Sequence, residues 1–219
     1  MIAEAVNYAE IISQLPPDSF LIRENVSWEE YEDLLEQVVD ATWLRVSYDD
    51  GTLQIMTTGP KHENYATFIE AMVGIVRLRK RMNIRFFGSS TMRKKKKRKG
   101  TEPDACFYIQ TAEALGKRID LDFEKDPPPD VAVEVDITRH SISKFGIYAG
   151  LGVPEVWIYD GKELKIYLLE LDEYRPGTKS RALPMLSGPI LTQFLSQLRE
   201  EGELQAILAF DEWLQSQGS

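Results

Sequence analysis

Two acidic residues stand where apolar runs begin and end, and a metal ion could bind between them. Asp104 precedes the apolar run 105–109, and Glu134 lies near the end of the run 131–135. A carboxylate at the tip of a buried strand is costly unless it meets a cation. Hard divalent cations, Mg²⁺ above all, bind one or two carboxylates together with water and phosphate oxygens. Two such strand tips side by side would therefore make a site for Mg²⁺ or Mn²⁺.

Lys144 could supply the third group that such a site needs. It follows Glu134 by ten residues, in a segment that predicts a helix. A bound metal ion activates water and neutralises charge on a phosphoryl group, and a nearby lysine can stabilise the developing charge or orient the nucleophile. Two metal-binding carboxylates and a lysine are the smallest set of groups that phosphodiester hydrolysis needs. A purely structural interpretation stays open, because Pro-Asp pairs also form turns and a strand that ends at Glu134 can run out into solvent.

The basic residues are concentrated in one segment. The chain has 26 basic and 35 acidic residues and a net charge of −9, yet 12 basic and no acidic residues lie between Arg77 and Lys99. A localised cationic patch on an acidic protein is typical of binding to a polyanion such as DNA. It equally suits a solvated hairpin whose lysines protect an exposed strand edge. The candidate DNA-binding residues are Arg81, Lys94, Lys95, Lys96, Lys97, Arg98 and Lys99.

The spacing of apolar and turn residues predicts the elements that would position these groups. Ser27 and Glu30 form a capping-box pattern that opens a helix. Alternation over 43–48 and 52–57, around an Asp-Asp-Gly turn, predicts a hairpin. Apolar residues at helical spacing predict a long helix over about 62–82.

Further along, the chain alternates between predicted strands and helices. We expect short strands at 84–88, from 91 onward and at 105–109, a loop over 110–129, a strand at 131–135, a helix over 141–150, strands at 155–159 and 162–169, and two amphipathic helices from 189. Tyr148, Trp157 and Cys106 are expected to pack in the core. This order of elements predicts a single domain of the α/β class.

Composition and missing motifs exclude several classes of protein. Hydrophobic residues make up 43% of the chain and charged residues 28%, so it can bury a core. The single cysteine allows no intramolecular disulfide or cysteine zinc site and fits a reducing cytoplasm. The sequence has no signal-peptide pattern, no apolar stretch of the ~20 residues that a membrane span needs, no phosphate-binding loop and no serine-hydrolase arrangement. We therefore expect a cytoplasmic protein without a membrane segment or nucleotide cofactor.

The order of these signals resembles that of the Uma-type putative restriction endonuclease family, within the PD-(D/E)XK nuclease superfamily. The resemblance is carried by Glu102-Pro103-Asp104, by the strand 133–138, and by Lys144 followed by the segment 148–157. It covers roughly residues 24 to 169. Its most specific part is the second half, where a strand, a helix and a strand carry matching signals in order.

The resemblance implies a restriction-endonuclease-like core, with a mixed central sheet flanked by helices, an N-terminal hairpin and C-terminal helices. We divide the chain into an N-terminal arm (1–23), the nuclease domain (24–175) and a helical extension of the same domain (176–219). Carried over by residue, the resemblance implies Asp104 and Glu134 as metal ligands and Lys144 as the catalytic lysine.

Three nearby residues have open roles. Asp136 occupies the place where the superfamily pattern expects a lysine, so it is either a third acidic ligand, on the same strand face as Glu134, or points away. Glu63, at the start of the predicted long helix, reaches the site in the way that superfamily members suggest, or it complements the helix N-terminus. His62 contacts phosphate or water, or has a structural role.

Three functions are compatible with these residues. The first is an Mg²⁺-dependent endonuclease that hydrolyses DNA. The second is a protein of the same fold that binds nucleic acid or a partner without cleaving, and the displaced lysine motivates it. The third is a scaffold whose basic run only keeps a strand edge soluble. We also expect a homodimer assembled through the C-terminal helices, because symmetric dimers are the commonest oligomers.

Overall fold

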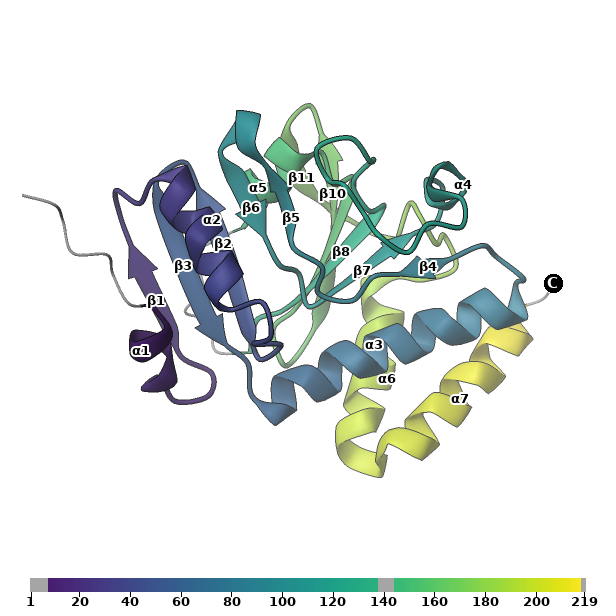
Figure 1. The fold of residues 1–219 in the computed structure, drawn as a ribbon. Coiled ribbons are helices and arrows are strands. Elements are labelled where there is room, and N and C mark those ends of the chain that lie inside the picture. Colours follow the sequence, from purple (N-terminus) through teal and green to yellow (C-terminus); the bar gives the residue numbers. More distant parts are fainter. Residues whose placement is uncertain (1–7, 138–143, 218–219) are drawn as a thin grey trace, which may run out of the picture.

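The computed structural model of the protein describes residues 8–137 and 144–217. Its strands form two sheets, and three long helices lie together beneath the larger one (Figure 1). The start of the predicted helix 141–150 lies outside the described residues. No helix in the described ranges has the length and apolar character to cross a bilayer.

The smaller sheet has five strands and is antiparallel throughout. Its order is β1 (Phe20–Arg23), β3 (Thr52–Thr57), β2 (Leu44–Asp49), β6 (Lys99–Thr101) and β5 (Met92–Lys94). The predicted hairpin is therefore present as β2 and β3. It is built into this sheet, where the prediction had it as an N-terminal addition to a single central sheet. The pairing of β1 with β3 also joins the end of the predicted N-terminal arm to the sheet.

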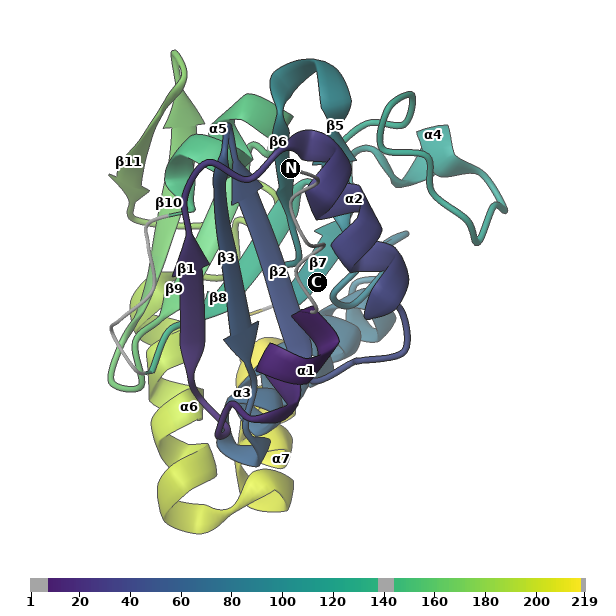
Figure 2. The same cartoon turned by 60° about the vertical axis from the view of Figure 1, so that its left-hand side comes forward.

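Helix α2 (Trp28–Gln37) covers the smaller sheet. It begins as the capping box predicts, since the Glu30 amide donates a hydrogen bond of 3.0 Å to Ser27 Oγ. The Glu30 carboxylate does not complete the box and accepts a hydrogen bond from Tyr8 of α1 (Tyr8–Ser13). Trp28, Tyr31 and Leu34 of α2 are buried against β2 and β3 and form a core separate from the main one. Figure 2 shows α2 alongside β2.

The larger sheet has six strands and is mixed, as predicted. Its order is β11 (Glu173–Gly177), β10 (Leu164–Glu170), β9 (Glu155–Tyr159), β8 (Val131–Val135), β7 (Ala105–Tyr108) and β4 (Arg85–Phe86). Only β8 and β9 run parallel. The chain between them contains α5 (Phe145–Leu151), which ends at Gly152 with a left-handed φ of 84°, a conformation that glycine favours at the end of a helix.

Several short elements were not predicted. The segment predicted as a loop over 110–129 contains a one-turn helix, α4 (Ala112–Leu115), in which Ala112 and Leu115 are buried. Strand β11 was not predicted because its sequence, Glu-Tyr-Arg-Pro-Gly, is short and contains a proline and a glycine, so it lacks the apolar alternation that marks a half-buried strand. A short 3₁₀ turn, η1 (Lys95–Lys97), also joins β5 to β6.

Three helices cover one face of the larger sheet: α3 (Pro60–Arg79), α6 (Gly188–Glu201) and α7 (Glu203–Ser216) (Figures 1 and 2). Their apolar faces and those of β7 to β10 form the main hydrophobic core. Phe194 of α6 and Phe210 of α7 meet edge to face at 5.1 Å between ring centroids. The two C-terminal helices, which were predicted as amphipathic, are thus part of the same core as the sheet.

We expect Phe210→Ala to lower the free energy of unfolding by about 3–5 kcal/mol, because a fully buried aromatic ring is replaced by a cavity. Leu208→Ala is the matched control in the same helix, since Leu208 is exposed, and it should change stability by only about 0.5 kcal/mol. Urea unfolding of both variants measures the difference. Equal, small effects would show that α7 packs only loosely on the rest of the domain.

Cys106 lies in the middle of β7 and is fully buried, as predicted. Burial raises the pKa of its thiol to about 12, so the reactive thiolate is scarce at neutral pH. We expect no reaction with a thiol-specific reagent in the native state and one equivalent of reaction after unfolding in urea. Rapid labelling of the native protein would contradict this placement of β7.

Candidate active site

The candidate site lies where the chain crosses from one sheet to the other. Residues Glu102 to Asp104 connect β6 of the smaller sheet to β7 of the larger one. The Glu102 carboxylate fixes this crossing, because it accepts hydrogen bonds from the Val46 amide (2.8 Å) and from Thr91 Oγ1 (2.6 Å). Burial raises the pKa of this carboxyl group. The crossing holds Asp104 at the entrance of β7.

The two predicted metal ligands are neighbours on adjacent strands. In the antiparallel pair of β7 and β8, Ala105 lies opposite Val133, and the same register places Asp104 opposite Glu134. The Val135 amide also donates a hydrogen bond of 2.7 Å to Asp104 Oδ2. Both acidic residues are buried, at 5% and 8% exposure. The structure therefore brings together the pair of carboxylates that the sequence suggested.

Lys144 reaches this pair from the segment before α5. Its Nζ lies 3.0 and 2.9 Å from the two carboxylate oxygens of Glu134. The prediction placed Lys144 within a helix, whereas the structure places it at the N-cap position, one residue before α5 begins. Tyr148, one turn into α5, donates a hydrogen bond from its hydroxyl to Glu134 Oε1. This tyrosine was predicted only as a core residue, and it is both buried and in contact with the site.

Arg45 of β2 is a buried cation at the site that sequence reasoning did not single out. Its Nε donates to Asp104 Oδ1 at 3.1 Å, and Nη2 lies 2.8 Å from Glu63 Oε1. Its Nη1 donates to the carbonyl oxygens of Thr42 and Leu44. All three guanidinium nitrogens are thus used, and the side chain is 3% exposed. Arg45 lies in an alternating strand, and nothing in that pattern distinguishes it from a solvent-facing arginine.

His62 and Glu63 lie in the first turn of α3, next to the site. Glu63 is connected to Asp104 only through its ion pair with Arg45, and its side chain is 46% exposed. His62 is buried, and its Nε2 lies 3.2 Å from Asp104 Oδ2, which is the distance of an ion pair. The first turn of α3 therefore packs against Asp104. The involvement of Glu63 in metal binding stays a prediction.

Asp136 follows β8 and is partly exposed, and its amide donates a hydrogen bond to the carbonyl of Tyr159. Among the residues described, no three His, Cys, Asp or Glu side chains are grouped so that they could hold a metal ion. In the described part of the chain, Asp136 therefore does not form a three-ligand metal site with Asp104 and Glu134. Its role as a third ligand stays a prediction.

The two carboxyl groups are shifted in opposite directions. For Asp104, burial favours the neutral form, but the neighbouring His62 and then Lys144 and Arg45 outweigh it, so the pKa of Asp104 lies below its usual range. For Glu134, burial prevails over the attraction of Lys144, and the negative charge of Asp104 adds to it, so the pKa of Glu134 is raised. For His62, burial disfavours the charged ring, but Asp104 more than offsets this and raises the pKa.

The donor set of the site fits a hard divalent ion bound by two carboxylates and water. A carboxylate oxygen can accept two hydrogen bonds. Among the described residues, Asp104 Oδ1 accepts one, from Arg45, and Glu134 Oε2 accepts one, from Lys144. With respect to these residues, one oxygen of each carboxylate can therefore accept a further partner. This is the type of site that Mg²⁺ and Mn²⁺ use when substrate phosphates complete the coordination.

The predicted DNA-binding residues do not form one patch. Arg81 follows the C-terminal end of α3, while Lys94 to Lys99 form the turn between β5 and β6, at a distant edge of the molecule (Figure 1). Several of the basic side chains at this turn are neutralised locally: Lys95 pairs with Glu29 and Glu32, Arg98 with Asp50, and Lys99 with Asp49. Lys96 and Lys97 are exposed and make no ion pair with the described part of the chain. The turn therefore carries less net positive charge than the sequence suggests.

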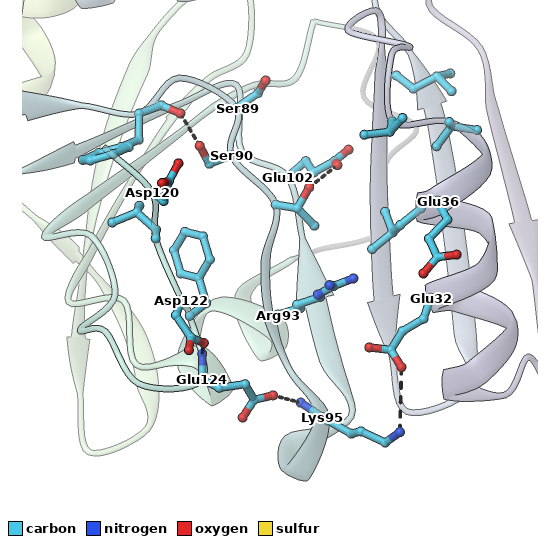
Figure 3. A pocket seen from close by; sticks show the side chains of 18 of the residues that line it. Glu32, Glu36, Ser89, Ser90, Arg93, Lys95, Glu102, Asp120, Asp122 and Glu124 are labelled. Carbon is cyan, nitrogen blue, oxygen red and sulfur yellow. Dashed lines mark hydrogen bonds and ion pairs between the residues drawn. The ribbon is translucent and has the colours of Figure 1, made fainter. Parts of the chain in front are cut away.

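The carboxylate of Glu102 also lines a large cleft of about 1180 Å³ between α2, β5 and the segment 119–124. Figure 3 shows acidic side chains on both walls and Lys95 spanning the opening, where its amide donates to Glu124 and its ammonium group lies near Glu32. The cleft has six carboxylates, from Glu32, Glu36, Glu102, Asp120, Asp122 and Glu124, against three cations, from Arg93, Lys95 and Lys96. Such a lining repels the phosphate backbone of DNA.

Comparison with known proteins places this site in a family. The profile of the Uma2 family, described as "Putative restriction endonuclease", matches residues 28–199, which is most of the chain. The chain belongs to the Uma2 family. The matched range includes every residue of the site and both sheets except β1.

Among solved structures, the chain is similar to a protein from Anabaena variabilis ATCC 29413 described as a putative nuclease, with 17% identity and a TM-score of 0.49, over 68% of this chain and 90% of that chain. No curated protein matches the chain. Uma2 membership confirms the family that the motifs suggested and agrees with the predicted restriction-endonuclease-like core.

Proposed function

We propose that this protein is a metal-dependent endonuclease that hydrolyses phosphodiester bonds of DNA. The observation that carries the proposal is the contact of Lys144 with both oxygens of Glu134, directly beside the buried Asp104. Two carboxylates and a lysine that meet at one point are the groups that phosphodiester hydrolysis requires. Membership of a family described as restriction endonucleases supports DNA as the substrate.

Each residue of the site has a role in this proposal. Asp104 and Glu134 would hold Mg²⁺ or Mn²⁺, which when bound would activate water and neutralise phosphoryl charge. Lys144 assists the nucleophile or stabilises the charge that develops on the phosphoryl oxygens. Tyr148 and Arg45 position Glu134 and Asp104 through their hydrogen bonds. Glu63 is tied to the site by Arg45 and does not contact the carboxylate pair in this state.

The test is cleavage of supercoiled plasmid DNA by the purified protein. We expect nicked and linear products in Mg²⁺ or Mn²⁺, none in a chelator, and none from Asp104→Asn. A matched control is Asp172→Asn, because Asp172 is an exposed residue of the turn between β10 and β11. Cleavage by Asp104→Asn at the wild-type rate would contradict the assignment of the site.

A second candidate function is a protein that binds nucleic acid or a partner without cleaving. The observation that favours it is the local neutralisation of the site: Arg45, His62 and Lys144 already surround the two carboxylates, and a bound cation must compete with them. This candidate predicts DNA binding that weakens steeply with salt, together with no cleavage in either metal ion. The homodimer and the cytoplasmic location stay predictions.

A further inference from the structure

A second, smaller cleft opens directly on Asp104. Its volume is about 470 Å³, within the range of small-molecule binding sites. One wall is the face of α3 that carries Glu63, Thr67 and Glu70, and Arg45 and Asp104 form its inner part. The indole of Trp43 lines the cleft and is 44% exposed. A group bound here would lie next to Asp104, whose carboxylate is itself fully buried.

The charges of this cleft favour a neutral ligand that donates hydrogen bonds. The lining has three carboxylates, from Glu63, Glu70 and Asp104, and one cation, Arg45, whose nitrogens are all engaged within the protein. A phosphate group placed in it would be repelled. Glu70 is partly buried and makes no hydrogen bond or ion pair with the described residues, so its oxygens are free to accept a donor. Amino and imino groups on the edges of nucleobases are such donors.

Trp43 adds a surface on which a flat ring can stack. Two other tryptophans, Trp28 and Trp157, are buried, so the exposure of Trp43 is not a general property of tryptophan in this fold. Stacking of a base on an aromatic side chain contributes about 1–3 kcal/mol and tolerates any base. The cleft therefore offers a single base an indole on which to stack and a carboxylate that can accept its hydrogen bonds.

We infer that this cleft binds one unpaired nucleobase, stacked on Trp43 and hydrogen-bonded to Glu70, next to the phosphodiester bond that is cleaved at Asp104. The inference rests on the proposed function and specifies its substrate class: DNA with an unpaired nucleotide, in a single strand or at an unpaired position of a duplex. A base within a regular duplex cannot enter such a cleft unless it is first extruded from the stack, which costs a few kcal/mol.

The neighbouring large cleft supports this choice of substrate. Thr42 and Ser89 line both clefts, so the two clefts are neighbours. The acidic lining of the large cleft repels a duplex with its two phosphate backbones. A flexible strand can keep the phosphates that are not cleaved outside both clefts and still insert one base into the smaller one.

The test is the affinity of the protein for three fluorescent DNAs of one sequence: a single strand, a perfect duplex, and a duplex with one unpaired base. Binding is measured by anisotropy in a chelator and in Ca²⁺. We expect the single strand and the interrupted duplex to bind more tightly than the perfect duplex. Trp43→Ala should weaken these two complexes by about 5- to 100-fold, which corresponds to the loss of one stacked base. Trp43→Phe should stay within about 3-fold of wild type, because phenylalanine also stacks.

Two outcomes would overturn the inference: unchanged affinity of Trp43→Ala for the single strand while thermal unfolding confirms its fold, or equal affinity of the wild type for single strand and perfect duplex in both conditions. The binding assay does not depend on cleavage. Binding that depends on Trp43 without any cleavage in Mg²⁺ would therefore reject the proposed function and keep the base-binding site. Cleavage by the wild type together with unchanged binding by Trp43→Ala would reject the base-binding site and keep the proposed function.

Discussion

Lys144→Ala is expected to slow DNA cleavage by about 10²–10³-fold, the loss that follows removal of one well-placed group that stabilises transition-state charge. The Lys144 ammonium group contacts both oxygens of Glu134, and no other basic side chain of the described residues pairs with that carboxylate. Single-turnover cleavage of an end-labelled oligonucleotide measures the effect. A matched control is Lys162→Ala, because Lys162 is an exposed lysine in the turn between β9 and β10.

The same substitution leaves Glu134 buried without its partner, so part of the loss could come from stability. Urea unfolding of Lys144→Ala separates the two effects, because it shows whether the variant is folded under the conditions of the cleavage assay. If the variant is folded there and still cleaves slowly, the loss is catalytic. Cleavage by Lys144→Ala within about 2-fold of wild type, well short of the expected loss, would exclude Lys144 from the reaction.

Arg45→Ala is expected to lower the free energy of unfolding by about 3–5 kcal/mol, the usual cost of removing one partner from a buried ion pair. The substitution leaves the buried Asp104 without its hydrogen bond from Nε and leaves the carbonyls of Thr42 and Leu44 without a donor. The matched control is Arg98→Ala, which breaks an exposed ion pair with Asp50 and should cost at most about 1 kcal/mol.

Urea unfolding of Arg45→Ala, Asp104→Asn and the double variant forms a cycle that isolates the coupling between the two residues. We expect the double variant to be clearly more stable than the sum of the single effects predicts, because removing both partners leaves no unpaired charge. Strict additivity would show that Arg45 stabilises the fold independently of Asp104.

The local pattern of the sequence was sufficient to predict most elements. Strands β8 and β9 have the predicted bounds because continuous β-branched and aromatic runs define them, and α3 follows from its apolar stripe. Local pattern does not report which strands share a sheet. The division into two sheets depends on the pairing of β2 with β6, which lie about fifty residues apart, Asp49 with Lys99 for example.

The same distinction applies to the site. Asp104 and Glu134 were predictable because each is an acidic residue at the edge of an apolar run, and the pairing of β7 with β8 then places them side by side. Arg45 was not predictable, because its importance comes only from the approach of the smaller sheet to the larger one. The separation of the basic residues was not predictable for a similar reason. The path of the chain from α3 to β5 places Arg81 far from Lys94 to Lys99, although these residues are close in sequence.

The central claim is that Asp104 and Glu134 bind a divalent metal ion together. A crystal of the protein grown with Mn²⁺, measured for anomalous scattering from manganese, tests this most directly. We predict one peak at about 2.1 Å from an oxygen of each carboxylate, the distance typical of small hard cations. Lys144 and Arg45 should then either move away from these oxygens or contact only the oxygens that the metal ion leaves free. A peak at another position, or no peak between Asp104 and Glu134 in a protein that cleaves DNA in Mn²⁺, would contradict the claim.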